Sequence, residues 1–199
     1  MKDLTAICVF CGSSEGKDAA FTDAAIRTGT VFAQQNIRLV YGGSSVGMMG
    51  ALAHACAAEG GDVIGVHPAF LQAYEAMNDA VGQTIVANDL YERKHLMIEQ
   101  SDGFLVLPGG LGTLDELFEV WTQVQLDRQT KPIGILNIKG FFDPLLAAVK
   151  TMQEAGFLNQ DIFDYIQQDT EIEPLLDKMR ASQTQSFIQE KMAFRRRDA

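Results

Sequence analysis

The stretch LPGGLGTLDELFEVW, residues 107–121, marks the end of a strand and the start of a helix. An apolar run leads into it, three glycines and Thr113 follow, and apolar residues then recur with the spacing of a helix that buries one face. Adjacent glycines let the backbone turn tightly or approach a ligand closely. The stretch therefore allows two interpretations. It is a tight turn before a well-capped helix, or its backbone wraps a phosphate and Glu116 acts on the group that the phosphate carries.

Strands and helices alternate along the chain on both sides of this junction. The strands are short, nearly continuous runs of Val, Ile and Leu, which is typical of a parallel sheet buried on both faces. We expect an α/β fold with a Rossmann-like, doubly wound parallel sheet and helices on both faces. Strands are predicted at residues 5–11, 37–41, 62–68, 83–88, 104–110, 131–137 and 163–169. Helices are predicted at residues 17–35, 48–61, 89–103, 113–126, 141–155 and, at the C-terminus, from about 171 to 195, and Asp89 is the expected cap of the third.

Three loops at the carboxyl ends of predicted strands are rich in glycine or serine. They are CGSS at residues 11–14, YGGSSVG at residues 41–47 and LPGGLGT at residues 107–113. In an open parallel sheet, a ligand binds outside the carboxyl ends of the strands, where such loops enter the following helices. The sequence therefore predicts a ligand site at this edge. In the second loop, Gly42, Gly43 and Gly47 fit close approach to a ligand and close packing of a helix on the sheet equally well.

The composition is that of an ordinary globular protein. Of the 199 residues, 47% are hydrophobic and 21% are charged, and we expect one domain over residues 1–199. The formal net charge of −10 argues against a nucleic-acid-binding surface, which would be basic, but it allows a small anionic ligand. No apolar stretch approaches the ~20 residues of a membrane span, and the N-terminus lacks the pattern of a signal peptide. We therefore expect a cytoplasmic protein with neither a membrane nor a nucleic-acid partner.

The cysteines indicate a reducing compartment. There are three of them, an odd number that does not make a disulfide framework. Cys8 and Cys11 have CxxC spacing, but they lie in a strand-like run in which they face opposite sides. Packing in the core is therefore favoured over a redox or metal function.

The glycines of residues 109–112 match neither of the common nucleotide-binding loops. No Lys-Ser or Lys-Thr follows them, as a Walker A loop requires. From Gly110 the pattern runs G-x-G-x-x-D, so Asp115 replaces the third glycine of the dinucleotide fingerprint, and the loop follows about the fifth strand instead of the first. Backbone N–H groups at a helix N-terminus nevertheless suit a single phosphate.

Thr113 and Glu116 have the T-x-x-E spacing of a capping box. In that motif the Thr113 hydroxyl accepts from the amide of Glu116, and the Glu116 carboxylate accepts from the amide of Thr113. The spacing alone favours this structural interpretation. Three upstream glycines, however, give more backbone freedom than a helix start requires.

Arg93 and Lys94 lie near the start of a predicted helix, where positive side chains oppose the helix dipole. Residues that destabilise their own helix in this way can mark a functional site, although a solvated charged turn with Glu92 nearby is the simpler explanation. The three histidines do not cluster, and no HExxH, paired-Cys or Ser/His/Asp pattern stands out. We therefore expect neither a metal site nor a hydrolase triad.

The segments YGGSSVGMMG, ERKHLM and PGGLGTLDE occur in this order. Together they resemble the LONELY GUY family, the cytokinin riboside 5′-monophosphate phosphoribohydrolases. The resemblance extends from CVFCGSS to about residue 180, and PGGxGTxxE is its specific part. It implies an enzyme that hydrolyses the N-glycosidic bond of an adenosine 5′-monophosphate derivative to the free base and ribose 5-phosphate. Many members carry an older label of lysine decarboxylase, but the chain shows no site for the pyridoxal phosphate that such chemistry usually employs, and we expect no cofactor.

The resemblance also implies which residues form the site. Arg93 and Glu116 would be the catalytic pair. The substrate-binding residues would be Ser13, Gly43, Glu75, Lys94, Gly109, Gly110, Leu111, Gly112, Thr113 and Thr122. Family members are commonly dimers, which implies a homodimer with an active site shared between the subunits. The helices bearing Met48, Met49 and Trp121 are candidate dimer surfaces, although their apolar periodicity is equally that of core helices.

The chemistry of a glycosidic cleavage fits these residues. Breaking a ribosyl N-glycosidic bond develops positive charge on the sugar. A carboxylate at Glu116 could stabilise that charge, orient the attacking water or take its proton, and Arg93 could hold Glu116 or the sugar phosphate. Two alternatives stay open: a broader glycosidase acting on AMP or other purine nucleotides, and a non-catalytic carrier of molybdenum cofactor or nucleotide with the same fold.

Overall fold

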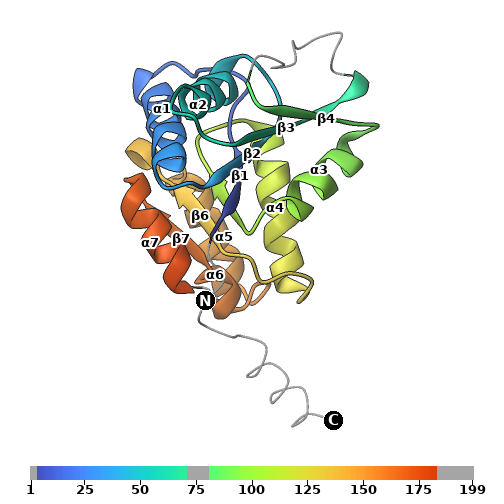
Figure 1. Cartoon of the computed structure of the whole chain (residues 1–199). Helices are drawn as coiled ribbons and strands as arrows, with labels where there is room; N and C mark the ends of the chain where they lie inside the picture. The colour runs from blue at the N-terminus through green and yellow to red at the C-terminus, as the bar shows by residue number, and fades with distance from the viewer. Residues whose placement is uncertain (1–3, 71–80, 183–199) are drawn as a thin grey trace.

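The structure is a computed structural model that describes residues 4–70 and 81–182. Within them, seven strands form one sheet. They are β1 (Ala6–Phe10), β2 (Arg38–Tyr41), β3 (Val63–Pro68), β4 (Gln83–Ala87), β5 (Gly103–Val106), β6 (Ile133–Leu136) and β7 (Ile166–Asp169). Their order is β4-β3-β2-β1-β5-β6-β7, and each neighbouring pair is parallel (Figure 1). The predicted parallel sheet is confirmed, and all of the predicted strands are present.

Helices cover both faces of this sheet, as the doubly wound fold requires (Figure 1). They are α1 (Ala19–Gln34), α2 (Gly47–Ala58), α3 (Leu90–Glu99), α4 (Leu111–Gln125), the short 3-10 helix η2 (Ile138–Gly140), α5 (Asp143–Glu154), α6 (Gln160–Phe163) and α7 (Ile172–Ser182). Helices α1, α2 and α7 pack on one face, and α3 to α6 pack on the other. Helix α7 begins where the C-terminal helix was predicted, and the rest of that prediction lies outside the described residues. None of the described helices is long and apolar enough to cross a membrane.

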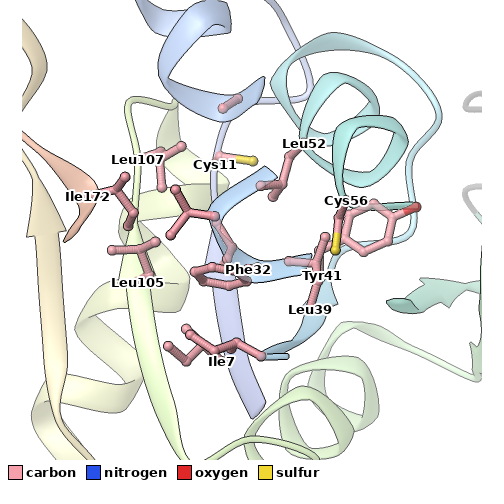
Figure 2. Packing of buried hydrophobic residues seen from close by; sticks show 14 of the residues in the cluster. Ile7, Cys11, Phe32, Leu39, Tyr41, Leu52, Cys56, Leu105, Leu107 and Ile172 are labelled. Carbon is pink, nitrogen blue, oxygen red and sulfur yellow. The ribbon is translucent and has the colours of Figure 1, made fainter. Parts of the chain in front are cut away.

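Strand β1 is buried on both faces because its apolar side chains alternate between two cores. Ile7 packs beneath α1 and α2, where Figure 2 shows it near Phe32, and Cys8 packs on the opposite side with the helices of the other face. Cys11, just after the strand, returns to the first core (Figure 2). Both cysteines are free and buried, so the prediction that they face opposite sides and pack in the core is confirmed.

Helix α3 ends earlier than its sequence suggests, because the residues after it join the sheet. It stops at Glu99 instead of continuing to Gly103. The amide of Asp102 donates to the carbonyl of Ala6 at 2.7 Å, and the Asp102 carboxylate accepts from the hydroxyl of Thr5 at 2.7 Å. These bonds commit the chain to the parallel ladder, and Gly103 becomes the first residue of β5.

The strand order reverses at β1, which lies between β2 and β5. From β1 the chain winds outward to β4, then returns to β5 and winds outward the other way to β7. In such sheets, ligands bind at this switch point, outside the carboxyl ends of the central strands. The two loops that meet there are joined by a hydrogen bond from the amide of Gly12 to the carbonyl of Pro108 at 3.1 Å. The fold thus brings the CGSS and PGG loops together.

Candidate active site

A cavity of about 310 Å³ opens at the carboxyl end of the sheet. Ser13 from the loop after β1 and Gly42 from the loop after β2 line one part of it. Arg93 of α3 and Glu116 of α4 line another, together with the first residues of α4. The cavity therefore draws on all three glycine- and serine-rich loops that the sequence analysis singled out.

Arg93 is held by three acceptors from three parts of the chain. Its Nη1 donates to Oε1 of Glu116 at 2.9 Å, its Nε donates to the carbonyl of Val66 at 3.0 Å, and its Nη2 donates to the carbonyl of Gly42 at 3.3 Å. The Arg93 side chain is only 13% exposed and that of Glu116 only 9%. The interpretation of Arg93 as part of a solvated turn is therefore wrong, since Arg93 belongs to a buried ion pair.

The N-cap of α3 places Arg93 on the side that faces the cavity. The Asp89 carboxylate accepts hydrogen bonds from the amides of Tyr91 and Glu92 at 2.9 and 2.8 Å, as the sequence predicted for this residue. Helix geometry then puts residues three apart on one face, so Leu90 and Arg93 both line the cavity.

Burial dominates the electrostatics of Glu116. Loss of water raises the pKa of this carboxyl above its ordinary value of 4.5, and the charge of Arg93 opposes the rise. Asp115 raises the pKa further, and Lys94 lowers it. The result is a carboxylate that is paired with a cation yet more basic than a free glutamate. Such a group can stabilise positive charge or accept a proton from water.

The start of α4 differs from the capping-box interpretation. The helix begins at Leu111, its N-cap is Gly110, and no side chain caps it. Thr113 therefore lies inside the first turn, with its side chain packed so closely against Gly109 that a Cβ there would collide with it. The Glu116 carboxylate bonds Arg93. The capping-box interpretation is wrong because the N-cap is Gly110, three residues before the Thr113 that the T-x-x-E spacing requires.

The uncapped first turn of α4 can bind an anion. The first N–H groups of a helix have no intrahelical acceptor, and the helix dipole favours negative charge near them. At Gly110 and Gly112 nothing lies within 4 Å of the position that a Cβ would occupy, so a ligand can approach this backbone. Thr113 is 3% exposed, and it lines the cavity beside these residues.

Most of the substrate-binding residues expected from the family lie at this site. The cavity is lined by Ser13, Gly110, Leu111, Gly112 and Thr113, together with Arg93 and Glu116. Gly109 lines a neighbouring cavity of about 260 Å³, which shares Gly12, Ser13 and Gly110 with the first.

Three of the expected residues that the structure describes do not line either cavity. Lys94 points to the outer face of α4, where its Nζ pairs with Asp115 at 3.1 Å and Glu119 at 3.2 Å. Gly43 has a φ of +78° and packs on β3. Thr122 is exposed on α4. Glu75 lies outside the described residues.

The structure adds side chains that the sequence analysis did not assign to the site. Met49 and Leu90 line the cavity, and Met49 is only 8% exposed. Met48 and Trp121 are buried in the two cores at 2% and 4% exposure, so these methionines and Trp121 are core residues of this chain. The position of Met49, directly after the second glycine loop, was the one available signal that it faces a ligand.

Among residues 4–70 and 81–182, no three His, Cys, Asp or Glu side chains gather closely enough to hold a metal ion. No lysine in this part of the chain lines the cavity that contains Arg93 and Glu116, so no side chain in that cavity could form a Schiff base with pyridoxal phosphate.

Known proteins with similar sequences identify the family. The family model "Possible lysine decarboxylase" matches residues 49–179. The chain is 43% identical over 173 residues to "Probable cytokinin riboside 5′-monophosphate phosphoribohydrolase LOGL1" of Oryza sativa subsp. japonica, a match that covers 87% of this chain and 78% of that protein. The chain belongs to the LONELY GUY family. It is also 45% identical over 153 residues to cytokinin riboside 5′-monophosphate phosphoribohydrolase LOG1 of Arabidopsis thaliana, covering 77% of this chain and 72% of that LONELY GUY protein.

Solved structures share the fold of this LONELY GUY chain at lower identity. The molybdenum cofactor binding protein from the phototrophic bacterium Rippkaea orientalis superposes with a TM-score of 0.68 at 21% identity, covering 91% of this chain and 98% of that one. The protein TM1055 superposes with a TM-score of 0.70 at 17% identity, covering 89% and 99%. At these identities the likeness concerns the Rossmann-like fold alone.

Proposed function

We propose that this protein hydrolyses the N-glycosidic bond of cytokinin riboside 5′-monophosphates and releases the free base and ribose 5-phosphate. The LONELY GUY relatives are named for this activity. The observation that carries the proposal is the buried Arg93–Glu116 pair, which faces the same cavity as the uncapped first turn of α4. The first turn of α4 binds an anion, and the Glu116 carboxylate across the cavity stabilises positive charge.

The 5′-phosphate binds at the start of α4 in this proposal. The amides of the first turn and the Thr113 hydroxyl donate to its oxygens, and the glycines let it approach. Binding energy from this remote group then holds the glycosidic bond beside Glu116. Gly109, Gly110, Leu111, Gly112, Thr113 and Ser13 form this part of the site.

Glu116 acts on the sugar and on water. As the bond between C1′ and the base nitrogen breaks, its electrons leave with the base and positive charge grows on the ribose. The Glu116 carboxylate stabilises that charge and accepts a proton from the water whose oxygen bonds to C1′. The departing base takes up a proton from solvent, and Glu116 then releases the proton that it accepted, so one water is consumed in total. Arg93 holds the carboxylate in place, and the step uses water alone, without a cofactor or metal.

Chromatography of base release tests this proposal. The purified protein is incubated with isopentenyladenosine 5′-monophosphate and, separately, with AMP. Release from the isopentenyl substrate at the higher kcat/KM is the expected result. Equal or faster release from AMP would replace the cytokinin assignment with a broader purine nucleotide glycosidase. No release from either by folded protein would contradict the enzyme and favour a carrier.

We predict that the phosphate supplies much of the catalytic efficiency. The matching nucleosides, which lack the 5′-phosphate, should show kcat/KM lower by about 100-fold or more, because they lose several charge-assisted hydrogen bonds. Thr113→Val should slow hydrolysis of the monophosphate and leave the slow hydrolysis of the nucleoside unchanged. Thr28→Val is the matched control, since Thr28 is also a buried helical threonine, with its hydroxyl bonded to Ala24. Equal loss on both substrates would argue against a phosphate contact at Thr113.

We also propose a homodimer whose subunits share the active site. Leu90 and Leu111 line the cavity yet are 46% and 87% exposed, and Tyr91 beside them is 81% exposed. Large apolar side chains at the mouth of a site are typical of a surface that a second subunit covers. Lys94 and Thr122, which lie outside the cavity of their own subunit, and Glu75 are proposed to contact the substrate in the complete dimer.

A measurement of the oligomeric state tests whether this surface forms the dimer interface. Light scattering should find a dimer for the wild type and a monomer with lowered activity for Tyr91→Glu. Phe157→Glu is the control, because Phe157 is equally exposed, at 83%, but follows α5. A wild-type monomer with full activity would contradict the shared site.

The cysteines and the net charge of the chain support a cytoplasmic location and a small anionic substrate. Cys8, Cys11 and Cys56 are free and buried, which fits the reducing cytoplasm, where we place the protein. The net charge of −10 fits a small anionic substrate held by local positive potential, and it disfavours partners such as nucleic acid or an anionic membrane surface. We assign the activity to one nucleotide-monophosphate-binding domain over residues 1–199.

A further inference from the structure

Gly42 lies at the point where β2 ends and the cavity begins. Its carbonyl accepts from Nη2 of Arg93, and the Val66 carbonyl on neighbouring β3 accepts from Nε. The guanidinium therefore spans the ends of two strands before it reaches Glu116. Each of its three nitrogens has an acceptor, so its plane is fixed and Nη1 points at the carboxylate.

The absence of a side chain at Gly42 is what makes room for this arrangement. A Cβ at this position would overlap Nη2 of Arg93 and lie 2.8 Å from Sδ of Met49. The backbone itself does not require glycine here, because Gly42 is not among the residues with positive φ. Gly43 is the contrast, since its φ of +78° alone favours glycine. The space at Gly42 is needed by the guanidinium.

We propose that Gly42 is a positioning residue for the hydrolysis: its bare Cα and its carbonyl hold the Arg93 guanidinium against Glu116. The inference rests on the proposed function, in which this pair acts on the sugar. A side chain at position 42 would turn the guanidinium away and take from the carboxylate the cation to which it is hydrogen-bonded.

The other charged and titratable groups near Glu116 cannot replace Arg93. Lys94 of α3 is engaged by Asp115 and Glu119 on the outer face. Asp115 of α4 carries the same charge as Glu116 and raises its pKa. On β1 and directly after it, burial and then the charge of Glu116 raise the pKa of the Cys8 and Cys11 thiols, which stay neutral. Displacement of Arg93 therefore raises the pKa of Glu116 further.

Gly42→Ala tests the proposal against a matched variant, Gly134→Ala. A Cβ at Gly134 would lie 2.5 Å from Sδ of Met179, so both substitutions press on a methionine sulfur, but only the first meets an arginine. Gly42→Ala should lower kcat/KM by about 100-fold, and it should move the acid limb of its pH profile to higher pH. Gly134→Ala should leave the position of that limb unchanged. A Gly42→Ala enzyme with an unmoved acid limb would overturn the proposal.

A stability cycle gives a second readout that does not depend on turnover. In the Glu116→Gln background, Gly42→Ala should lower the denaturation midpoint clearly. In the Arg93→Ala/Glu116→Gln background the guanidinium is gone, so adding Gly42→Ala should lower the midpoint much less. Equal losses in both backgrounds would overturn the role of Gly42. If the losses are unequal but the wild-type protein shows no turnover, the role of Gly42 in holding Arg93 stands and the proposed function is refuted instead.

Discussion

Glu116→Gln should lower kcat for base release by about 1,000-fold or more while the protein stays folded. Glutamine keeps the shape of the side chain, and its carbonyl oxygen can still accept from Nη1 of Arg93. It carries no negative charge to stabilise the developing sugar cation and no basic oxygen to take a proton from water. Because burial disfavours the charged form of Glu116, the thermal midpoint of the variant should equal or exceed that of the wild type.

The control for this variant is Glu119→Gln, three residues further along α4. Its carboxylate bonds Lys94 on the outer face and is 39% exposed, so the same change of charge there should leave kcat within about twofold. We would measure the rates of both variants above and below neutral pH, together with their melting curves. These data decide whether turnover requires the carboxylate of Glu116. A Glu116→Gln enzyme with nearly full kcat would reduce Glu116 to a structural partner of Arg93.

Arg93→Ala should destabilise the protein by about 3–5 kcal/mol at neutral pH, because it leaves a buried carboxylate without its counter-ion. This loss should depend on pH in a definite direction. The folded-state pKa of Glu116 lies above its unfolded value, and it rises further without Arg93. The electrostatic penalty therefore grows as the pH rises from the raised folded-state pKa of Glu116 in the wild type, and it is complete above the still higher pKa in the variant. Below the wild-type value the carboxyl is protonated in both folded proteins, and this part of the loss disappears.

Lys94→Ala is the matched control for Arg93→Ala. The two residues are adjacent on α3 and equally exposed, but the partners of Lys94 are 64% and 39% exposed and can be hydrated after its removal. Urea unfolding should show a loss of at most about 1 kcal/mol for Lys94→Ala. A loss for Arg93→Ala that stays constant from acidic to neutral pH would mean that the buried charge of Glu116 is not its cause.

The sequence predicted the architecture because its signals were local and repeated. Short Val, Ile and Leu runs mark the buried strands, and glycine-rich loops follow those strands whose ends meet at the switch point. Asp89 indicates the start of a helix in the sequence, and in the structure it is the N-cap of α3. These features depend on a few neighbouring residues, which is the range over which sequence patterns are informative.

The contacts within the site were less accessible to sequence reasoning. The spacing of Thr113 and Glu116 fits a capping box, and only the position of Arg93, brought in from another helix, shows that Glu116 turns toward the cavity. Arg93 and Lys94 are adjacent in sequence, yet helix geometry sends one inward and the other to the outer face. The direction in which each of these side chains points follows from packing between distant parts of the chain. Local sequence patterns do not encode it, and the site residues were therefore predicted from the resemblance to the family.

The measurement that tests the central claim most directly is identification of both products by mass spectrometry. Wild-type protein is incubated with isopentenyladenosine 5′-monophosphate until a defined fraction is consumed. Free isopentenyladenine and ribose 5-phosphate in equal amounts, absent with Glu116→Gln protein that melts like wild type, is the result that we predict. Nucleoside and inorganic phosphate, or an unchanged substrate with folded wild-type protein, would contradict it.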